Sequence, residues 1–245
     1  MPLPSYGFDP SEAAIPWKLL SQQGMQIVIA TPEGKKAVAD ARMLTGKNLG
    51  LWKKMLRARY DAVAAYAELE MDTEFNHPLT YAEANEREFD ALLLPGGHDK
   101  GVREYLESKL LQQLVADFFV AQKPIAAICH GVVLAARAKL PMTQRSVLYD
   151  YKTTALHKSQ ELAAYNLTRL WLGDYYLTYP EITVEDEVTS ALSSKENFIK
   201  GPTSFFRDDL QHLSRGFVVR DRNYLSGRWP GDAYSFSVEF SKMLT

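Results

Sequence analysis

The chain has 245 residues, of which 46% are hydrophobic and 24% are charged, and it contains a single cysteine. Its 28 lysines and arginines nearly balance 30 aspartates and glutamates, which argues against general nucleic-acid binding because that activity needs a basic surplus. One cysteine excludes an internal disulfide, and no apolar run approaches the roughly 18–20 residues of a membrane span. The first residues lack the basic stretch and apolar run of a signal peptide, so we expect a cytoplasmic protein.

Short apolar runs alternate with helical patterns along the chain. The runs are typical of strands buried on both faces of a parallel sheet and lie at residues 26–30, 91–94 and 124–128. The helical patterns cover residues 15–23, 49–69 and 110–122. A hairpin around Asp221, Arg222 and Asn223 is predicted over residues 216–225, and an amphipathic helix from about residue 232 to residue 244. This alternation predicts an α/β fold.

Two segments exceed a minimal α/β core, and we interpret them as insertions into one domain that covers residues 1–245. The first, about residues 40–85, is charged and helical. The second, about residues 150–213, contains an aromatic cluster made of Tyr165, Trp171, Tyr175, Tyr176 and Tyr179. Core packing is the simplest role for this cluster, and a wall of a substrate pocket or a dimer contact is the alternative.

The most informative motif surrounds the single cysteine, Cys129. The sequence Ala127-Ile128-Cys129-His130-Gly131 follows a buried-strand pattern and precedes a helical pattern at residues 132–138. A strand, a sharp turn and a helix, with small residues two before and two after the nucleophile, define a nucleophile elbow. A helix start stabilises a thiolate, and the backbone N–H of His130 can donate to an oxyanion. The alternative is a buried structural cysteine.

A glycine pair follows the second predicted strand, in the sequence Pro95-Gly96-Gly97-His98. Paired glycines let the backbone approach a ligand closely, and the carboxyl end of a parallel strand is where α/β sheets place their sites. A plain turn is the alternative, and His98 by itself is typical of a surface loop. The five histidines show no ligand spacing, so no metal site is predicted.

Glu12 has a structural and a catalytic interpretation. Asp9, Pro10 and Glu12 fit the N-cap, first and third positions of a helix, where Glu12 could close a capping box. Pro16 removes the N–H that would bond to the Glu12 carbonyl, so an irregular helix is expected. If residues 3–5 end a first strand, Glu12 lies at the carboxyl edge of the sheet and is a candidate catalytic residue.

Together these motifs resemble the ThiJ/PfpI superfamily, a relative of the class I glutamine amidotransferases. The resemblance rests on Glu12, on the Pro95–His98 loop, on the Cys129 elbow, and on the closing sequences at residues 223–226 and 228–231. It implies a flavodoxin-like three-layer α/β sandwich with a central, mostly parallel sheet, a nucleophile elbow and helical insertions. It also implies a homodimer. The Cys-His adjacency and the insertions look most like the chaperone/glyoxalase III branch, which converts methylglyoxal to lactate without glutathione.

The resemblance also assigns roles to residues. Cys129 is the implied nucleophile, and Glu12 is implied to hydrogen-bond it. The amides of Gly97 and His130 form the implied oxyanion site, with Gly96 and His98 beside them as candidate substrate-binding residues. One departure is that only residues 1–5 precede Tyr6 where the family's first strand starts several residues earlier, so the front of a central strand is expected to be missing.

Three functions compete. The preferred one is a cofactor-free cysteine enzyme acting on a small reactive carbonyl, in which the Cys129 thiolate forms a hemithioacetal and Glu12 or His130 moves a proton. The second is a cysteine amidase or peptidase in which His130 contacts the sulfur and an acid orients it. The third is a redox sensor or holdase chaperone. A glutaminase is a weaker variant of the second hypothesis, because the late segment of the chain offers only Glu239 as an acid. Neither nucleic acid nor membrane is an expected partner.

Overall fold

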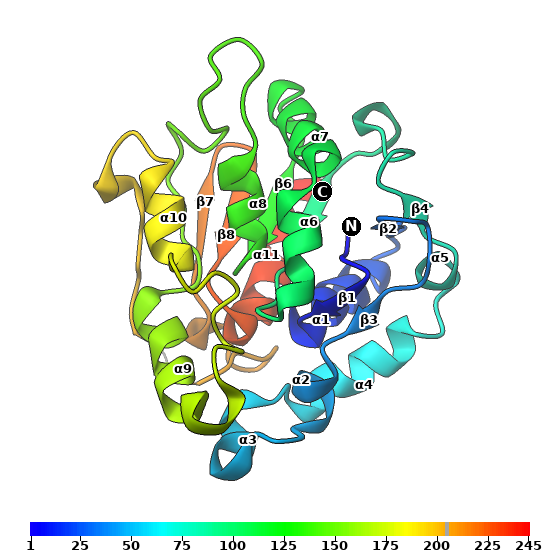
Figure 1. Ribbon diagram of the computed structural model, residues 1–245. Helices are drawn as coiled ribbons and strands as arrows, with labels where there is room; N and C mark the ends of the chain where they lie inside the picture. The colour runs from blue at the N-terminus through cyan, green and yellow to red at the C-terminus, as the bar shows by residue number, and fades with distance from the viewer. Residues whose placement is uncertain (204–205) are drawn as a thin grey trace.

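A computed structural model describes residues 1–203 and 206–245. Its largest sheet contains β5 (Leu92–Leu94), β6 (Ile125–Ile128), β8 (Tyr224–Gly227) and β7 (Val218–Asp221), in that order. The first three strands are parallel, and β7 runs antiparallel to β8 as the first arm of a hairpin (Figure 1). The α/β fold with a mostly parallel sheet is therefore confirmed.

Helices cover both faces of this sheet. On one face, α8 (Gly131–Arg137) packs on β5 and β6 and is flanked by α6 (Arg103–Glu107) and α7 (Lys109–Val120). On the other face, α11 (Ala233–Leu244) packs on β6 and β8 and contacts α1 (Pro10–Ser21), which in turn packs on α4 (Tyr60–Leu69) (Figure 1). The result is three layers.

Burial on both faces explains why the strands are continuously apolar. Leu94 and Ala127 belong to the core under α7 and α8, whereas Leu93, Ala126 and Ile128 belong to the core under α11. Successive side chains of a strand point to opposite faces, so each face of the sheet needs apolar side chains. None of the helices in residues 1–203 and 206–245 has the length and apolar character needed to cross a membrane.

The first residues extend the architecture through two short parallel pairs. Strand β1 (Tyr6–Phe8) pairs with β3 (Val38–Ala39), and β2 (Ala30–Thr31) pairs with β4 (Leu79–Thr80). The chain ahead of β1 lies beside β2, because the Leu3 N–H donates to the Ala30 carbonyl at 2.8 Å. The Asp9 N–H then donates to the Gly96 carbonyl at 3.0 Å, which brings the end of β1 to the end of β5.

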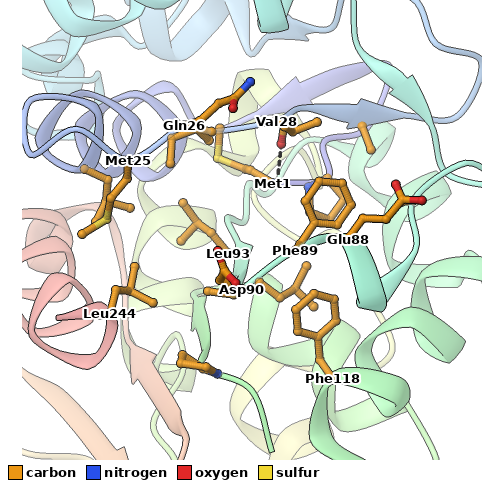
Figure 2. Close-up of a pocket in the computed structure, with 18 of the residues that line it drawn as sticks. Met1, Met25, Gln26, Val28, Glu88, Phe89, Asp90, Leu93, Phe118 and Leu244 are labelled. Atoms are coloured by element: carbon orange, nitrogen blue, oxygen red, sulfur yellow. Dashed lines mark hydrogen bonds between the residues drawn. The ribbon is translucent and has the colours of Figure 1, made fainter. Parts of the chain in front are cut away.

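The strand predicted over residues 26–30 forms a ladder only at its end, in β2. The residues before it line a cavity of about 570 Å³ together with Met1, Leu93 and Phe118, at the edge where the strands begin (Figure 2). The Met1 amino group donates to the Val28 carbonyl at 2.7 Å there. Residues 26–28 border this cavity and form no ladder.

The two segments interpreted as insertions meet each other beside the core. The first contains α2 (Ala41–Thr45), the 3-10 turn Gly50–Trp52, α3 (Lys53–Leu56), α4 and α5 (Thr73–Asn76). The second contains α9 (Lys158–Leu172) and α10 (Val184–Ser190), and its residues 204–205 lie outside the described residues. The Trp171 Nε1–H donates to the Asn48 carbonyl at 2.8 Å, and α9 lies beside α3 in Figure 1. The single-domain interpretation stays a prediction.

The helix predicted over residues 49–69 is wrong as a single element. Arg57 and Arg59 have extended backbones, with ψ of 159° at both, and they separate α3 from α4. Between them, the buried Ala58 donates its N–H to the Met43 carbonyl at 2.9 Å. The Ala58 N–H therefore bonds to α2 instead of forming a hydrogen bond within a continuous helix.

Candidate active site

Cys129 lies on a strained turn between β6 and α8. Its backbone has a φ of 57°, in the left-handed region that side chains other than glycine rarely occupy. Gly131, two residues further on, has no room for a side chain, because a Cβ there would lie 2.1 Å from the Leu94 carbonyl oxygen. Strand and helix therefore approach each other as a nucleophile elbow requires.

The turn brings His130 back to the sulfur of its neighbour. The His130 Nδ1 lies 3.4 Å from the Cys129 Sγ, and its Nε2 lies 2.9 Å from the Thr178 hydroxyl. That hydroxyl donates its proton to the His98 carbonyl at 2.8 Å, so its oxygen accepts from the His130 Nε2–H. Burial lowers the pKa of His130 to about 3. The ring is neutral, and the unprotonated Nδ1 faces the thiol.

Thr178 is the residue that the sequence analysis did not find. It is fully buried and lies in the second inserted segment, between α9 and α10. Forty-eight residues separate it from His130, and a threonine beside aromatic residues has no local signal of such a role. The peptidase hypothesis required an acid to orient His130, and a hydroxyl occupies that position instead.

Glu12 is fully buried in the first turn of α1 and points to the glycine loop. Its Oε2 accepts the Gly96 N–H at 3.0 Å, while Oε1 is buried with no partner of good hydrogen-bond geometry among the described residues. The capping box is wrong, because Asp9 gives its own N–H to the Gly96 carbonyl and accepts the Ser11 and Glu12 N–H groups on its side chain. Despite Pro16, α1 continues without a break.

The charged forms of the thiol and of the Glu12 carboxyl are both disfavoured by their surroundings. Burial raises the pKa of Cys129 well above its usual range, and the negative charges of Glu12 and Asp9 raise it further. Burial and the Asp9 charge likewise raise the pKa of Glu12. The helix start was expected to lower the thiol pKa, but Cys129 is only 4% exposed and desolvation dominates. A neutral thiol beside a neutral imidazole is the resting state.

The glycine pair is wedged between the elbow and the end of β1. A Cβ on Gly96 would lie 2.7 Å from the His130 N, and one on Gly97 would lie 2.9 Å from the Asp9 N. Gly97 also has a φ of 148°, so only glycine fits this close approach. The Gly96 N–H is occupied by Glu12, whereas no hydrogen bond from the Gly97 N–H occurs within the described ranges. The oxyanion role of the Gly97 and His130 amides stays a prediction.

His98 is half-buried rather than on the surface, with a side chain that is 13% exposed. Its ring stacks on Tyr176 at 4.5 Å between centroids and meets the edge of Tyr175 at 4.9 Å. Its Nε2 lies 3.9 Å from the Asp40 Oδ2, which also accepts the Tyr175 hydroxyl. The aromatic cluster of the second insertion therefore packs directly against the glycine loop.

Two charged residues of the closing segment have structural partners. Arg228 is fully buried and forms a two-pronged ion pair with Asp232, at 2.8 Å for each bond, which gives it a structural role. Glu239 pairs with Lys242 on the exposed side of α11 at 2.6 Å, so it supplies no acid for a glutaminase. In the part of the chain that the structure describes, no cluster of three histidine, cysteine or acidic side chains could hold a metal ion.

The protein-family model described as ThiJ/PfpI family-like matches residues 3–202. An uncharacterized protein of Schizosaccharomyces pombe is 27% identical over 177 residues, which covers 68% of this chain and 65% of that protein. The deglycase PfpI of Pyrococcus furiosus is 28% identical over 166 residues, which covers 68% of this chain and 69% of that protein. The crystal structure of glyoxalase III from Candida albicans has a TM-score of 0.64 at 17% identity, covering 97% of this chain and 88% of that one.

The three-layer fold and the cysteine on its elbow define a class of α/β proteins that present a side chain on a strained turn at the carboxyl edge of the sheet. Within that class, the chain belongs to the ThiJ/PfpI-like family, because the family model covers most of its length. The resemblance stated from the motifs is therefore confirmed. The matched region spans about two thirds of the curated relatives.

Proposed function

We propose that the protein is a cysteine-dependent, cofactor-free enzyme that converts small reactive carbonyl compounds, with methylglyoxal to lactate as the model reaction. The observation that carries the proposal is the neutral His130 Nδ1 at 3.4 Å from the Cys129 sulfur, with the buried Glu12 carboxyl interacting with the same thiol. The names of the Pyrococcus furiosus deglycase and the Candida albicans glyoxalase III support chemistry on reactive carbonyls.

The first step joins the thiol to the aldehyde. The Cys129 proton moves to His130 Nδ1 as the sulfur attacks the aldehyde carbon, and the carbonyl oxygen becomes an oxyanion. The Gly97 and His130 N–H groups are the donors for that oxyanion, which then takes a proton to give a hemithioacetal. A thiol that stays neutral until substrate arrives suits an addition in which proton and sulfur move together.

The second step moves a proton between the two substrate carbons. A base removes the hydrogen from the carbon attached to sulfur and delivers a proton to the neighbouring carbon. A second proton passes from the hydroxyl oxygen on the first carbon to the ketone oxygen on the second, which turns the hemithioacetal into a thioester of the hydroxy acid. Glu12 and His130 are the candidate bases, and a carboxyl with a raised pKa suits transfer near neutral pH. Water then cleaves the thioester, releases lactate and restores the thiol.

The hydroxyl partner of His130 favours this reaction over amide hydrolysis. A cysteine peptidase stabilises a charged imidazolium with an orienting acid, whereas Thr178 offers no charge and burial disfavours the imidazolium. Carbonyl addition needs only brief proton storage on His130.

The test is incubation of the purified protein with methylglyoxal alone, followed by measurement of lactate. We expect lactate from the wild type and none above background from Cys129→Ala. Equal lactate from both proteins, or none from the wild type, would overturn the proposal. An aminopeptidase amide substrate run in parallel tests the hydrolase alternative.

A further inference from the structure

A cluster of large apolar side chains is exposed where the two inserted segments meet. Leu51 is 97% exposed and Leu170 is 90% exposed. Three more exposed apolar residues accompany them: Trp52, Met55 and Trp171. Single apolar side chains are normal on a protein surface, whereas a contiguous cluster marks an interaction site. We call these five residues the apolar tip.

Two segments that are far apart in the sequence form the apolar tip. The 3-10 turn Gly50–Trp52 and α3 supply three of its residues, and the last turn of α9 supplies the other two. The Trp171 indole N–H donates to the Asn48 carbonyl at 2.8 Å, and a Cβ on Gly50 would lie 3.4 Å from the same indole ring. In Figure 1, α3 lies at the lower end of the molecule with the end of α9 beside it. The five side chains therefore share one projecting surface.

The surroundings of the apolar tip are basic. Residues 41–58 contain five basic residues and no acidic residue. Three of the five are exposed lysines: Lys47, Lys53 and Lys54. The acids that follow the two segments, Asp61 and Asp174, already form ion pairs with other side chains. Because the whole chain has a net charge of −2, this positive charge is local to one end of the molecule.

An anionic lipid bilayer matches an apolar surface with a basic border. Leucine and tryptophan side chains enter the boundary between headgroups and acyl chains, and lysines bind the negatively charged headgroups. A single-stranded nucleic acid needs aromatic rings for base stacking, but the two most exposed side chains of the apolar tip are the aliphatic Leu51 and Leu170. A second copy of this chain, docked through the same face, would place the lysines of both copies against each other.

We propose that the apolar tip and its lysines form a docking surface for bilayers that contain anionic lipids. In the docked state, Leu51 and Leu170 lie at the acyl boundary, and Lys47 and Lys54 contact the headgroups. No membrane partner is expected from the composition, but peripheral docking requires neither a membrane-spanning helix nor a basic surplus over the whole chain. None of these residues belongs to the proposed reaction centre, so the inference does not depend on the proposed function.

The test is sedimentation of the purified protein with vesicles of equal parts phosphatidylcholine and phosphatidylserine, beside vesicles of phosphatidylcholine alone. We expect binding to the mixed vesicles to be at least about tenfold tighter and to weaken as salt is added, because the lysines contact charged headgroups. No binding to the mixed vesicles, or equal binding to both kinds, would rule out the docking surface.

Two double variants separate the apolar contribution from the charged one. Leu51→Ser with Leu170→Ser should bind the mixed vesicles about tenfold more weakly. Lys47→Gln with Lys54→Gln should bind them about thirtyfold more weakly. Met142→Ser, at a side chain 97% exposed in the loop after α8, is the matched control and should bind like the wild type. All these side chains are exposed, so Tm should stay the same in every variant. Wild-type binding by either double variant contradicts the inference.

Tryptophan fluorescence and molar mass distinguish docking from its alternatives. Insertion should move the emission of the exposed Trp52 to shorter wavelength when mixed vesicles are added, and Trp52→Phe should reduce this shift. Sedimentation without an emission shift would show adsorption by charge alone and would count against the docking surface. A wild-type dimer that becomes monomeric in Leu51→Ser with Leu170→Ser, measured by light scattering, would make this face a contact between copies and would also overturn the inference.

Discussion

The His130 Nδ1 lies 3.4 Å from the Cys129 Sγ, and this contact exists because the backbone of Cys129 adopts a φ of 57°. Neighbouring side chains on an extended strand point to opposite faces, so a continued β6 would have separated the two. The strained turn converts adjacency in the chain into a contact between a thiol and a base.

Replacing Thr178 with valine should lower kcat for lactate formation about tenfold. The hydroxyl accepts the His130 Nε2–H and thereby keeps Nδ1 free of a proton, and the loss of one such hydrogen bond is about 1–1.5 kcal/mol. Steady-state kinetics check this. Thr178→Ser keeps the hydroxyl and should restore most of kcat, whereas equally slow Ser and Val variants would show that the hydroxyl is not what matters.

Replacing Glu12 with glutamine should make the thiol more reactive and the enzyme less active. The negative charge of Glu12, added to burial, raises the pKa of Cys129, so a neutral amide lets the thiol ionise at lower pH. Alkylation by iodoacetamide between pH 7 and 9 should be faster in Glu12→Gln, with Cys129→Ala as the blank.

Lactate formation by Glu12→Gln should meanwhile fall about a hundredfold or more, because a proton-transfer group is lost. Slower alkylation together with unchanged turnover would contradict both roles of Glu12.

Replacing Gly131 with alanine should destabilise the protein by about 3 kcal/mol, the upper end of the usual cost of overpacking. A Cβ would lie 2.1 Å from the Leu94 carbonyl oxygen, and relief would have to separate β5 from α8. Gly24→Ala is the matched control: its Cβ meets nothing within 4 Å, so only its φ of 83° costs about 1–2 kcal/mol. Urea unfolding measures both, and equal losses would show that the elbow tolerates a side chain.

Replacing Glu161 with glutamine should flatten the dependence of stability on pH. Burial raises the pKa of Glu161 from 4.5 to about 7, although the carboxyl accepts the Val184 N–H. The protonated Glu161 side chain therefore contributes up to about 3 kcal/mol to folding stability. This contribution is fully present below about pH 4.5 and is lost as the pH rises through 7.

Urea midpoints at pH 5 and pH 8 check the Glu161 prediction. The wild type should lose more stability than Glu161→Gln between these two values. An identical change in both proteins would place the pH dependence elsewhere, for example at Asp208, whose pKa burial raises to about 6.

Local patterns in the sequence determined the elements whose stabilising contacts lie close in the chain. Asp9 caps α1, Gly131 follows the elbow, and the hairpin turns at Arg222 with a φ of 55°. The strands at residues 92–94 and 125–128 were predictable because burial on both faces demands continuous apolar residues. The family resemblance came from the same short motifs.

Tertiary structure decided what depends on groups distant in the chain. The Glu12 carboxyl accepts the N–H of Gly96, 84 residues away in the sequence, instead of closing a capping box. The Thr178 hydroxyl likewise hydrogen-bonds the ring of His130, which is 48 residues away. Groups distant in the chain also decided the direction of the Cys129 pKa shift, which is upward, whereas the sequence pattern predicted a downward shift. A helix start acts within one turn and favours the thiolate, but desolvation and the charges of Glu12 and Asp9 arise only when separate segments pack around Cys129.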